Sequence, residues 1–223
     1  MVGGPILLVL TLQHDARFGS EAATASIAGL MPVAIYILVF AQLAIRGVGA
    51  IGCVLGGWAG FLAGVAVLSA FALSPIPAFA LTCAAFALAL RLLPHPPASA
   101  ASGAAPPTPP SWDIPVRMVA AAVMVLVISA VSASLGSHLS GLLAPFPIIT
   151  AVLTGFTLHH AGPAPLVPML RGFLIGFYAF ASFSLVVGLA LPGWSIAAAF
   201  ALAVVAAVAT AGTTRLIAAH AAR

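Results

Sequence analysis

Residues 166–191 read LVPMLRGFLIGFYAFASFSLVVGLAL, and Arg171 is the one charged residue among these 26 positions. After a break at Pro192-Gly193-Trp194, a second apolar run covers residues 195–217. A helix needs roughly 20 apolar residues to cross the hydrocarbon core of a bilayer. Each run therefore predicts one membrane-spanning helix, and the pair predicts a helical membrane protein.

The composition extends this prediction to the whole chain. Of the 223 residues, 63% are hydrophobic and 4% are charged, and the mean hydropathy is +1.26. In a soluble domain about 25% of the residues are charged, so seven basic and three acidic residues cannot cover a surface of this size in water. The basic residues are scattered arginines that form no stripe, which excludes nucleic acid as a partner.

Breaks at Gly, Pro, His or Arg divide the chain into eight apolar runs. They cover residues 2–12, 27–45, 48–73, 76–93, 114–133, 142–158, 166–191 and 195–217. The first run is too short to cross unless its helix continues through His14, Asp15 and Arg17. We predict an all-α polytopic bundle of about eight transmembrane helices, or seven if the first run does not span.

A segment rich in Pro and Ala, residues 94–113, separates two membrane halves at residues 1–93 and 114–223. Such a composition favours a hydrated, extended linker. The halves resemble each other, because Gly29-Leu30-Met31-Pro32 matches Gly141-Leu142-Leu143-Ala144-Pro145. Four helices per half would give both copies the same orientation, so the sequence predicts two parallel repeats.

The distribution of arginines predicts the orientation in the membrane. With eight crossings, Arg17 lies on one side and the other six arginines lie on the side of both termini and the linker. These six are Arg46, Arg91, Arg117, Arg171, Arg215 and Arg223. Arginine is enriched in cytoplasmic loops. We therefore expect an inner (plasma) membrane protein with both termini and the linker in the cytoplasm.

Proline occurs inside the second helix of each half, at Pro32 and at Pro145-Phe146-Pro147. Proline lacks the backbone N–H and frees a carbonyl, so we expect each helix to be broken or kinked there. Unwound backbone at membrane depth lines protein or a cavity, and paired interruptions in two repeats are typical of transporter sites. Kinking that serves packing alone is an equal alternative.

Polar residues in the same helices complete the candidate substrate site. Gln42 follows Pro32, and Thr150 and Thr154 share one helix face with Thr157 downstream of Pro147. Membrane threonines usually bond to their own helix, which is the alternative to lining a pore. Arg171 either contacts an anion at the inner mouth of a cavity or extends its charge to the headgroups.

Glycine recurs every four residues in the first half, at Gly52, Gly56, Gly60 and Gly64, and the spacing of Gly56 and Gly60 returns at Gly172 and Gly176. Helices approach closely along such a groove, so we interpret it as a packing ridge. Cys53 and Cys83 sit in apolar stretches as small packing residues. We expect no metal site and no cofactor.

The pattern Ser140-Gly141-Leu142 with Pro145-Phe146-Pro147, followed by His159 and by Leu170-Arg171, resembles the small four-helix bacterial inner-membrane proteins of the GlpM type. The resemblance implies that two four-helix units are fused in this chain. The second unit is the more similar one, because the first has no equivalent of His159 or Arg171. It implies a fold and no specific biochemical activity.

Three functions remain open. All three acids lie at or beyond helix ends, which disfavours ion-coupled antiport through a buried carboxylate. A permease or flippase-like transporter of a small or lipidic solute is the leading hypothesis. An integral membrane enzyme acting on a lipid or isoprenoid would use Asp113, Asp15 or Glu21 with a histidine such as His159. A scaffold would bind another membrane protein, or a second copy of the chain, through its small-residue ridges.

Overall fold

The computed structural model describes residues 3–94 and 141–221, together with scattered positions between 112 and 139. The described residues form helices, turns and loops, and they contain no strand. Six helical segments among them are long and apolar enough to span a membrane: α2 (Ala16–Ile45), α3 (Ala50–Leu68), α4 (Pro75–Leu92), the segment Gly141–Ala161 with α6 (Ile148–Ala161), α7 (Leu166–Ala190) and α8 (Ile196–Ala221). The prediction of a helical membrane bundle is confirmed.

Within the described residues, fewer spanning helices occur than the eight predicted for the whole chain. The described part of the chain has these six and one short helix, α1 (Gly3–Gln13). At 1.5 Å per residue, the 11 residues of α1 extend about 16 Å, roughly half of the ~30 Å hydrocarbon core. Most of the predicted span at residues 114–133 and nearly all of the linker at 94–113 lie outside the described residues.

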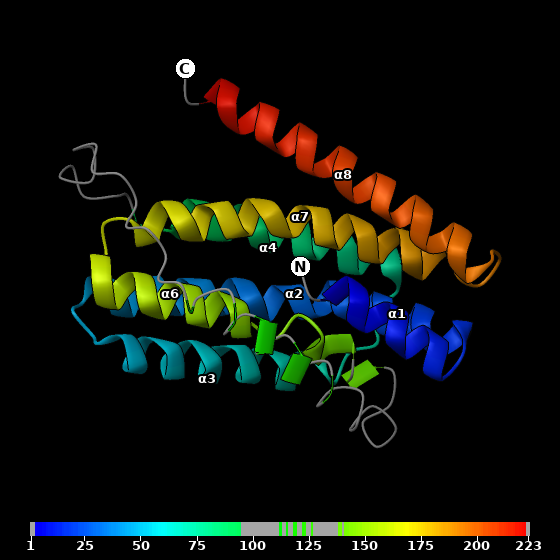
Figure 1. Ribbon diagram of the computed structural model, residues 1–223, viewed down its shortest axis with the longest axis horizontal. Coiled ribbons are helices and arrows are strands. Elements are labelled where there is room, and N and C mark those ends of the chain that lie inside the picture. The colour runs from blue at the N-terminus through cyan, green and yellow to red at the C-terminus, as the bar shows by residue number, and fades with distance from the viewer. Residues whose placement is uncertain are drawn as a thin grey trace.

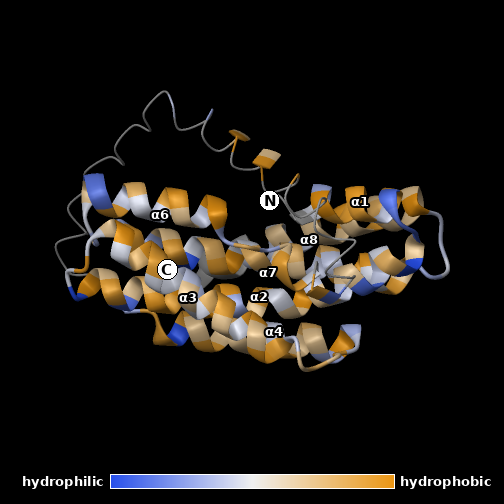
Figure 2. Ribbon diagram, turned by 90° about the horizontal axis from the view of Figure 1, so that it is seen from below, coloured by the Kyte–Doolittle hydropathy of each residue, from blue (hydrophilic) through white to orange (hydrophobic). Residues whose placement is uncertain are grey.

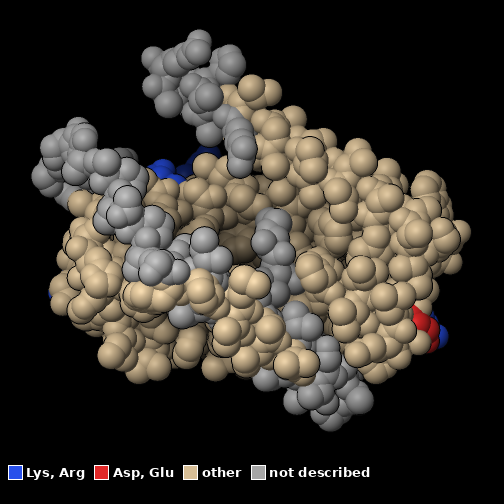
Figure 3. Space-filling view, in the orientation of Figure 1, with Lys and Arg blue, Asp and Glu red and all other residues tan. Residues whose placement is uncertain are grey.

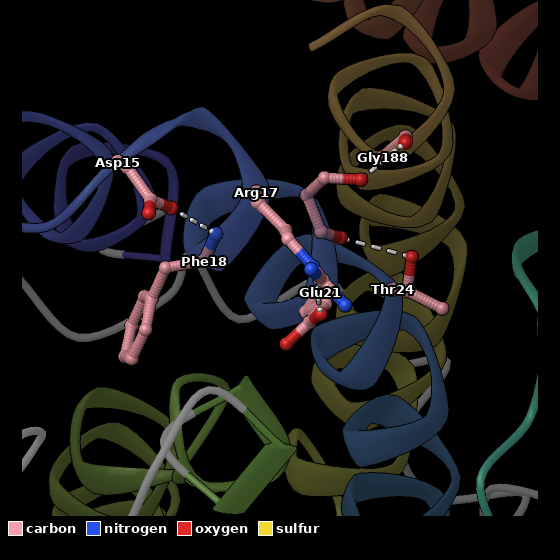
Figure 4. Close-up of polar contacts among 7 residues, drawn as sticks. Asp15, Arg17, Phe18, Glu21, Thr24 and Gly188 are labelled. Carbon is pink, nitrogen blue, oxygen red and sulfur yellow. Dashed lines mark hydrogen bonds and ion pairs between the residues drawn. The ribbon is translucent and has the colours of Figure 1, made fainter. Parts of the chain in front are cut away.

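The chain turns between α1 and α2, so the first apolar run does not continue into a longer helix. Asp15 has an extended backbone, with φ −163° and ψ 176°, and its carboxylate accepts a hydrogen bond of 2.6 Å from the Phe18 N–H (Figure 4). This is the N-cap geometry that starts a new helix. Consequently α2 begins at Ala16, well before the predicted start at residue 27.

Helix α2 is the central helix of the bundle. It contacts α1, α3, α4 and α7, and 67% of its most apolar window is buried, against 11% for α8. Helix α8 packs against α7 at the edge of the bundle (Figure 1). Because α7 also contacts α4, the helices from both sides of the linker pack together. The duplication into two parallel repeats stays a prediction.

Polar residues concentrate at the two ends of the bundle, and apolar residues cover the length between them (Figure 2). One end, here called the arginine end, carries Arg46 after α2, Arg91 in the last turn of α4 and Arg171 in the first turns of α7. The opposite end, here called the acidic end, carries Asp15 and Glu21 together with Arg17 (Figure 3). The Arg17 and Glu21 side chains form an exposed ion pair of 3.2 Å.

The glycine ridge of α3 packs against α2, as predicted. A Cβ atom at Gly56 would lie 2.5 Å from Leu43 Cδ1, and one at Gly64 would lie 3.1 Å from Pro32 Cβ. By contrast, no described atom lies within 4 Å of a Cβ placed at Gly172 or Gly176. The second pair of glycines therefore shares the spacing of the first but not its packing role.

Candidate functional site

The helix that crosses at residues 141–161 is interrupted at residues 144–147. The Ala144 N–H donates to the Gly141 carbonyl at 3.1 Å, the Phe146 N–H donates to the Leu143 carbonyl at 2.9 Å, and α6 starts at Ile148. Pro145 and Pro147 have no N–H to continue the helical ladder. The predicted interruption is confirmed at this position.

Small residues of α2 hold the interrupted segment. The Ser26 hydroxyl donates to the Gly141 carbonyl at 3.0 Å. A Cβ atom at Gly141 would lie within 2.3 Å of the Ala22 carbonyl oxygen, and one at Gly29 within 2.5 Å of the Leu142 carbonyl oxygen. Because both glycines are needed for this close approach, the Gly-Leu motif common to the two halves marks the place where they touch.

The second predicted interruption does not occur. Pro32 lies inside α2, which is helical from Ala16 to Ile45, and its ring is buried against Gly64. Nearby, the Thr82 hydroxyl of α4 donates to the Ile27 carbonyl at 2.8 Å. The proline removes the bond to the Ala28 carbonyl, one residue further on, and α2 nevertheless continues with the ring packed on α3. The expected break is therefore wrong at Pro32, where α2 is continuous, while the alternative of a kink stays a prediction.

The threonines of α6 lie within helix packing. Thr150 is 6% exposed and Thr154 is fully buried. The Thr154 hydroxyl donates a hydrogen bond to the Thr150 carbonyl at 2.8 Å. It also lies 3.3 Å from the Tyr36 hydroxyl of α2. The polar side of α6 thus fastens it to α2, and this face does not line an open pore.

Arg171 caps another helix. Its Nη2 atom donates to the carbonyl of Leu93, the C-cap residue of α4, at 3.4 Å, while its buried Nε atom has no hydrogen-bond partner among the described residues. A cation at a helix C-terminus interacts favourably with the helix dipole. Gln42 is half-buried near the end of α2 and belongs to the same end of the bundle.

An apolar groove of about 540 Å³ lies between α3 and α6. The two helices run in opposite directions (Figure 1), so Ala50 and His159 lie at its arginine end while Trp58 and Ala151 lie at its inner end. At 1.5 Å per residue, the eight residues from one end to the other give a length of about 12 Å. The lining residues are Ala50, Ile51, Val54, Leu55, Trp58, Ala151, Val152, Gly155, Phe156 and His159.

The interrupted helix packs against Trp58 at the inner end of this groove. The Phe146 ring lies 5.6 Å from the Trp58 ring and packs edge-on against Phe61 at 5.1 Å, both distances between ring centroids. Neither proline of the break lines the groove, and Pro32, Gln42, Thr150, Thr154 and Arg171 also lie outside its lining. The break therefore touches the groove through the contact of Phe146 with Trp58, a contact that the sequence analysis did not predict.

The pairing of an acid with His159, the histidine named for the enzyme hypothesis, does not form from Asp15 or Glu21, although His14 lies next to Asp15. Both acids lie at the acidic end, whereas His159 lies at the arginine end. The third acid, Asp113, lies outside the described residues. Within the described part of the chain, no three His, Cys, Asp or Glu side chains are grouped so that they could hold a metal ion.

Comparisons of this chain with protein-family models, with curated proteins and with solved structures found no match. The resemblance to GlpM-type proteins therefore stays a prediction. Six apolar helices of spanning length indicate that the chain is a multi-pass membrane protein. Its candidate site consists of the α3–α6 groove and the helix break that ends it.

Proposed function

We propose that this protein is a flippase-like transporter that moves an amphipathic solute along the α3–α6 groove. The observation that carries the proposal is the position of Phe146, which an interrupted helix holds against Trp58 at the inner end of the groove. Interrupted helices near mid-membrane form the substrate sites of many transporters, because non-helical backbone is tolerated there only beside protein or a cavity.

The lining of the groove favours a solute with a large apolar part. Hydrocarbon side chains dominate it, and among the described lining residues only His159, at the outer end, is titratable. A small hydrated solute would lose its water without finding polar partners, which is costly. Ile51 and Leu55 at the rim are 78% and 57% exposed. A solute dissolved in the bilayer would therefore enter the groove sideways from the lipid.

In this mechanism Phe146 is the barrier and the two flanking prolines keep it outside the regular helix. The segment is fixed to α2 on its upstream side through Gly141 and Ser26. Downstream, α6 is fixed through Thr154 and Tyr36. Movement is thus confined to the few residues between two anchored points, and a shift of the Phe146 ring would open the groove toward the acidic end.

Replacing both Pro145 and Pro147 with alanine restores two backbone donors and favours a continuous helix through Phe146. We expect the movement of a fluorescent phospholipid across proteoliposomes to fall roughly tenfold, as a rise of about 1.4 kcal/mol in the barrier would produce. The loss of protected fluorescence after dithionite addition measures this movement, and the amount of inserted protein should stay constant.

The matched control for the proline pair is Pro75→Ala, which changes a proline in the first turn of α4, where the missing N–H has no helical partner. Its lipid movement should equal that of the unchanged protein. Normal transport in the Pro145→Ala, Pro147→Ala variant would contradict the role of the break.

We also propose that the arginine end faces the cytoplasm of the cell inner membrane, since arginine is enriched in cytoplasmic loops. In a protein without Cys53 and Cys83, we expect Ser74→Cys at the acidic end to react with an impermeant maleimide on intact cells. His160→Cys at the arginine end should react only after lysis. Both side chains are exposed at helix ends. The reverse labelling pattern would overturn the orientation.

A further inference from the structure

The outer end of the α3–α6 groove lies next to positive charge. Arg46 follows α2 and is exposed, and only three residues separate it from Ala50, the first residue of α3 and a lining residue. The connection is tight, because the Val48 N–H donates to the Leu43 carbonyl at 3.1 Å and Gly47 has φ +79°. Arg46 is therefore held close to the mouth of the groove.

Nothing described at this end neutralises that charge. The described carboxylates, Asp15 and Glu21, both lie at the acidic end, on the far side of the bundle (Figure 3). The first turn of α3 adds to the positive potential, because its N-cap residue, Gly49, has no side chain to bond the free N–H groups. The mouth is thus complementary to an anion at the membrane surface.

The dimensions of the groove match one half of a bilayer. Its length of about 12 Å is slightly less than half of the ~30 Å hydrocarbon core. It starts at the level of Ala50 and His159, near the helix ends, and ends at Trp58, against which Phe146 packs. A single hydrocarbon chain that enters from the arginine end would fill this length and place its headgroup beside Arg46.

We propose that the groove binds one acyl chain of an anionic phospholipid, whose phosphate lies at Arg46 and the first turn of α3. This inference rests on the proposed function, because it assigns the solute class to the same groove. It concerns equilibrium binding, however, and can be tested without any measurement of transport.

Trp58 at the inner end provides the probe. The chain has three tryptophans, so replacing Trp112 and Trp194 with phenylalanine leaves Trp58 as the only one. In vesicles that contain phospholipids brominated on the acyl chain, we expect phosphatidylglycerol to quench Trp58 at about fivefold lower mole fraction than phosphatidylcholine, the effect of one basic residue at a membrane surface. The brominated chains are identical, so the difference reports the headgroup.

Arg46→Gln in the same background should bring the two lipids to equal quenching. Arg91→Gln is the matched control, since Arg91 is also exposed at the arginine end but belongs to α4, and it should keep the preference. Equal quenching by both lipids in the protein that retains Arg46, or a preference that persists in Arg46→Gln, would overturn the inference. So would a preference that Arg91→Gln abolishes as completely, because this would indicate a general accumulation of anionic lipid.

Soluble glycerol phosphate distinguishes a lipid site from a site for a free anion. It should not relieve the quenching by brominated phosphatidylglycerol, and relief at millimolar concentration would contradict the need for an acyl chain. Selective quenching in a protein that fails to move lipid would uphold this inference and overturn the proposed transport. Lipid movement without selective quenching would do the opposite.

Discussion

Gly141→Ala is expected to destabilise the protein strongly. The new methyl group would lie 2.3 Å from the Ala22 carbonyl oxygen and 2.5 Å from the Ala25 Cβ atom. Overpacking in a core typically costs about 1–3 kcal/mol, and here the nearest atom belongs to helical backbone that cannot rotate away. We expect a loss at or above the upper end of that range, measured as a lower midpoint of thermal unfolding in detergent.

Gly176→Ala is the matched control, because no described atom lies within 4 Å of its added methyl group. Its unfolding midpoint should equal that of the unchanged protein or exceed it slightly, since alanine favours a helix over glycine by about 1 kcal/mol. Equal midpoints for Gly141→Ala and Gly176→Ala would contradict the close approach of the interrupted segment to α2.

The glycines of the two halves show how far the sequence predicts the packing of the helices. Gly29 and Gly141 were recognised as equivalent positions in two halves, and the spacing of Gly56 and Gly60 was recognised again at Gly172. Spacing describes which residues share a helix face, and it does not determine which helix covers that face. Consequently one glycine ridge is filled by α2, while the other has no described neighbour.

The prolines show that the sequence also predicts local structure only in part, because the packing around each proline decides whether the helix breaks. A proline always removes one backbone donor, and this local fact predicts a weakened turn at both Pro32 and Pro145. At Pro32 the long helix continues, and Gly64 leaves room for the ring against α3. At residues 144–147 two prolines remove two donors within one turn, which neighbouring helices do not restore.

The start of α2 was missed for a different reason. The prediction began the helix at residue 27, where large apolar side chains begin, but the helix starts at Ala16 after the Asp15 cap. Between these points the chain is rich in Ala, Gly and Ser, which carry little hydropathy. These small residues are nevertheless among the most buried of the helix, with Ala22 and Ala23 fully buried, because the close packing of α2 requires them.

The groove could not be predicted from the sequence, because its two walls come from segments about a hundred residues apart. Residues of α3 such as Val54 and Leu55 look like any lipid-facing residues, and Gly155 of α6 looks like a packing glycine. Only the antiparallel placement of the two helices brings these walls together. The feature visible in advance was the proline break, which marks where the groove ends.

Gly155→Trp is expected to abolish lipid movement while leaving the fold intact. Gly155 lines the groove midway along α6, and a Cβ atom there would lie 3.5 Å from Val54 Cγ2, an ordinary contact distance. The backbone thus accepts a side chain, but an indole can only extend into the space between the two helices. The fluorescence that is protected from dithionite in proteoliposomes should then fall no faster than in vesicles without protein.

Two control variants distinguish a blocked groove from a disrupted fold. Gly155→Ala adds only the tolerated methyl group and should keep lipid movement within about twofold, since it fills little of the roughly 540 Å³ groove. Val208→Trp adds the same bulk to a residue of α8 that is 68% exposed, far from the groove, and it should transport normally. If Gly155→Trp inserts, unfolds at the usual midpoint and still moves lipid, the solute cannot pass between α3 and α6. The path would then have to run through another interface of the bundle, because a bulky residue at mid-groove leaves no room for an acyl chain.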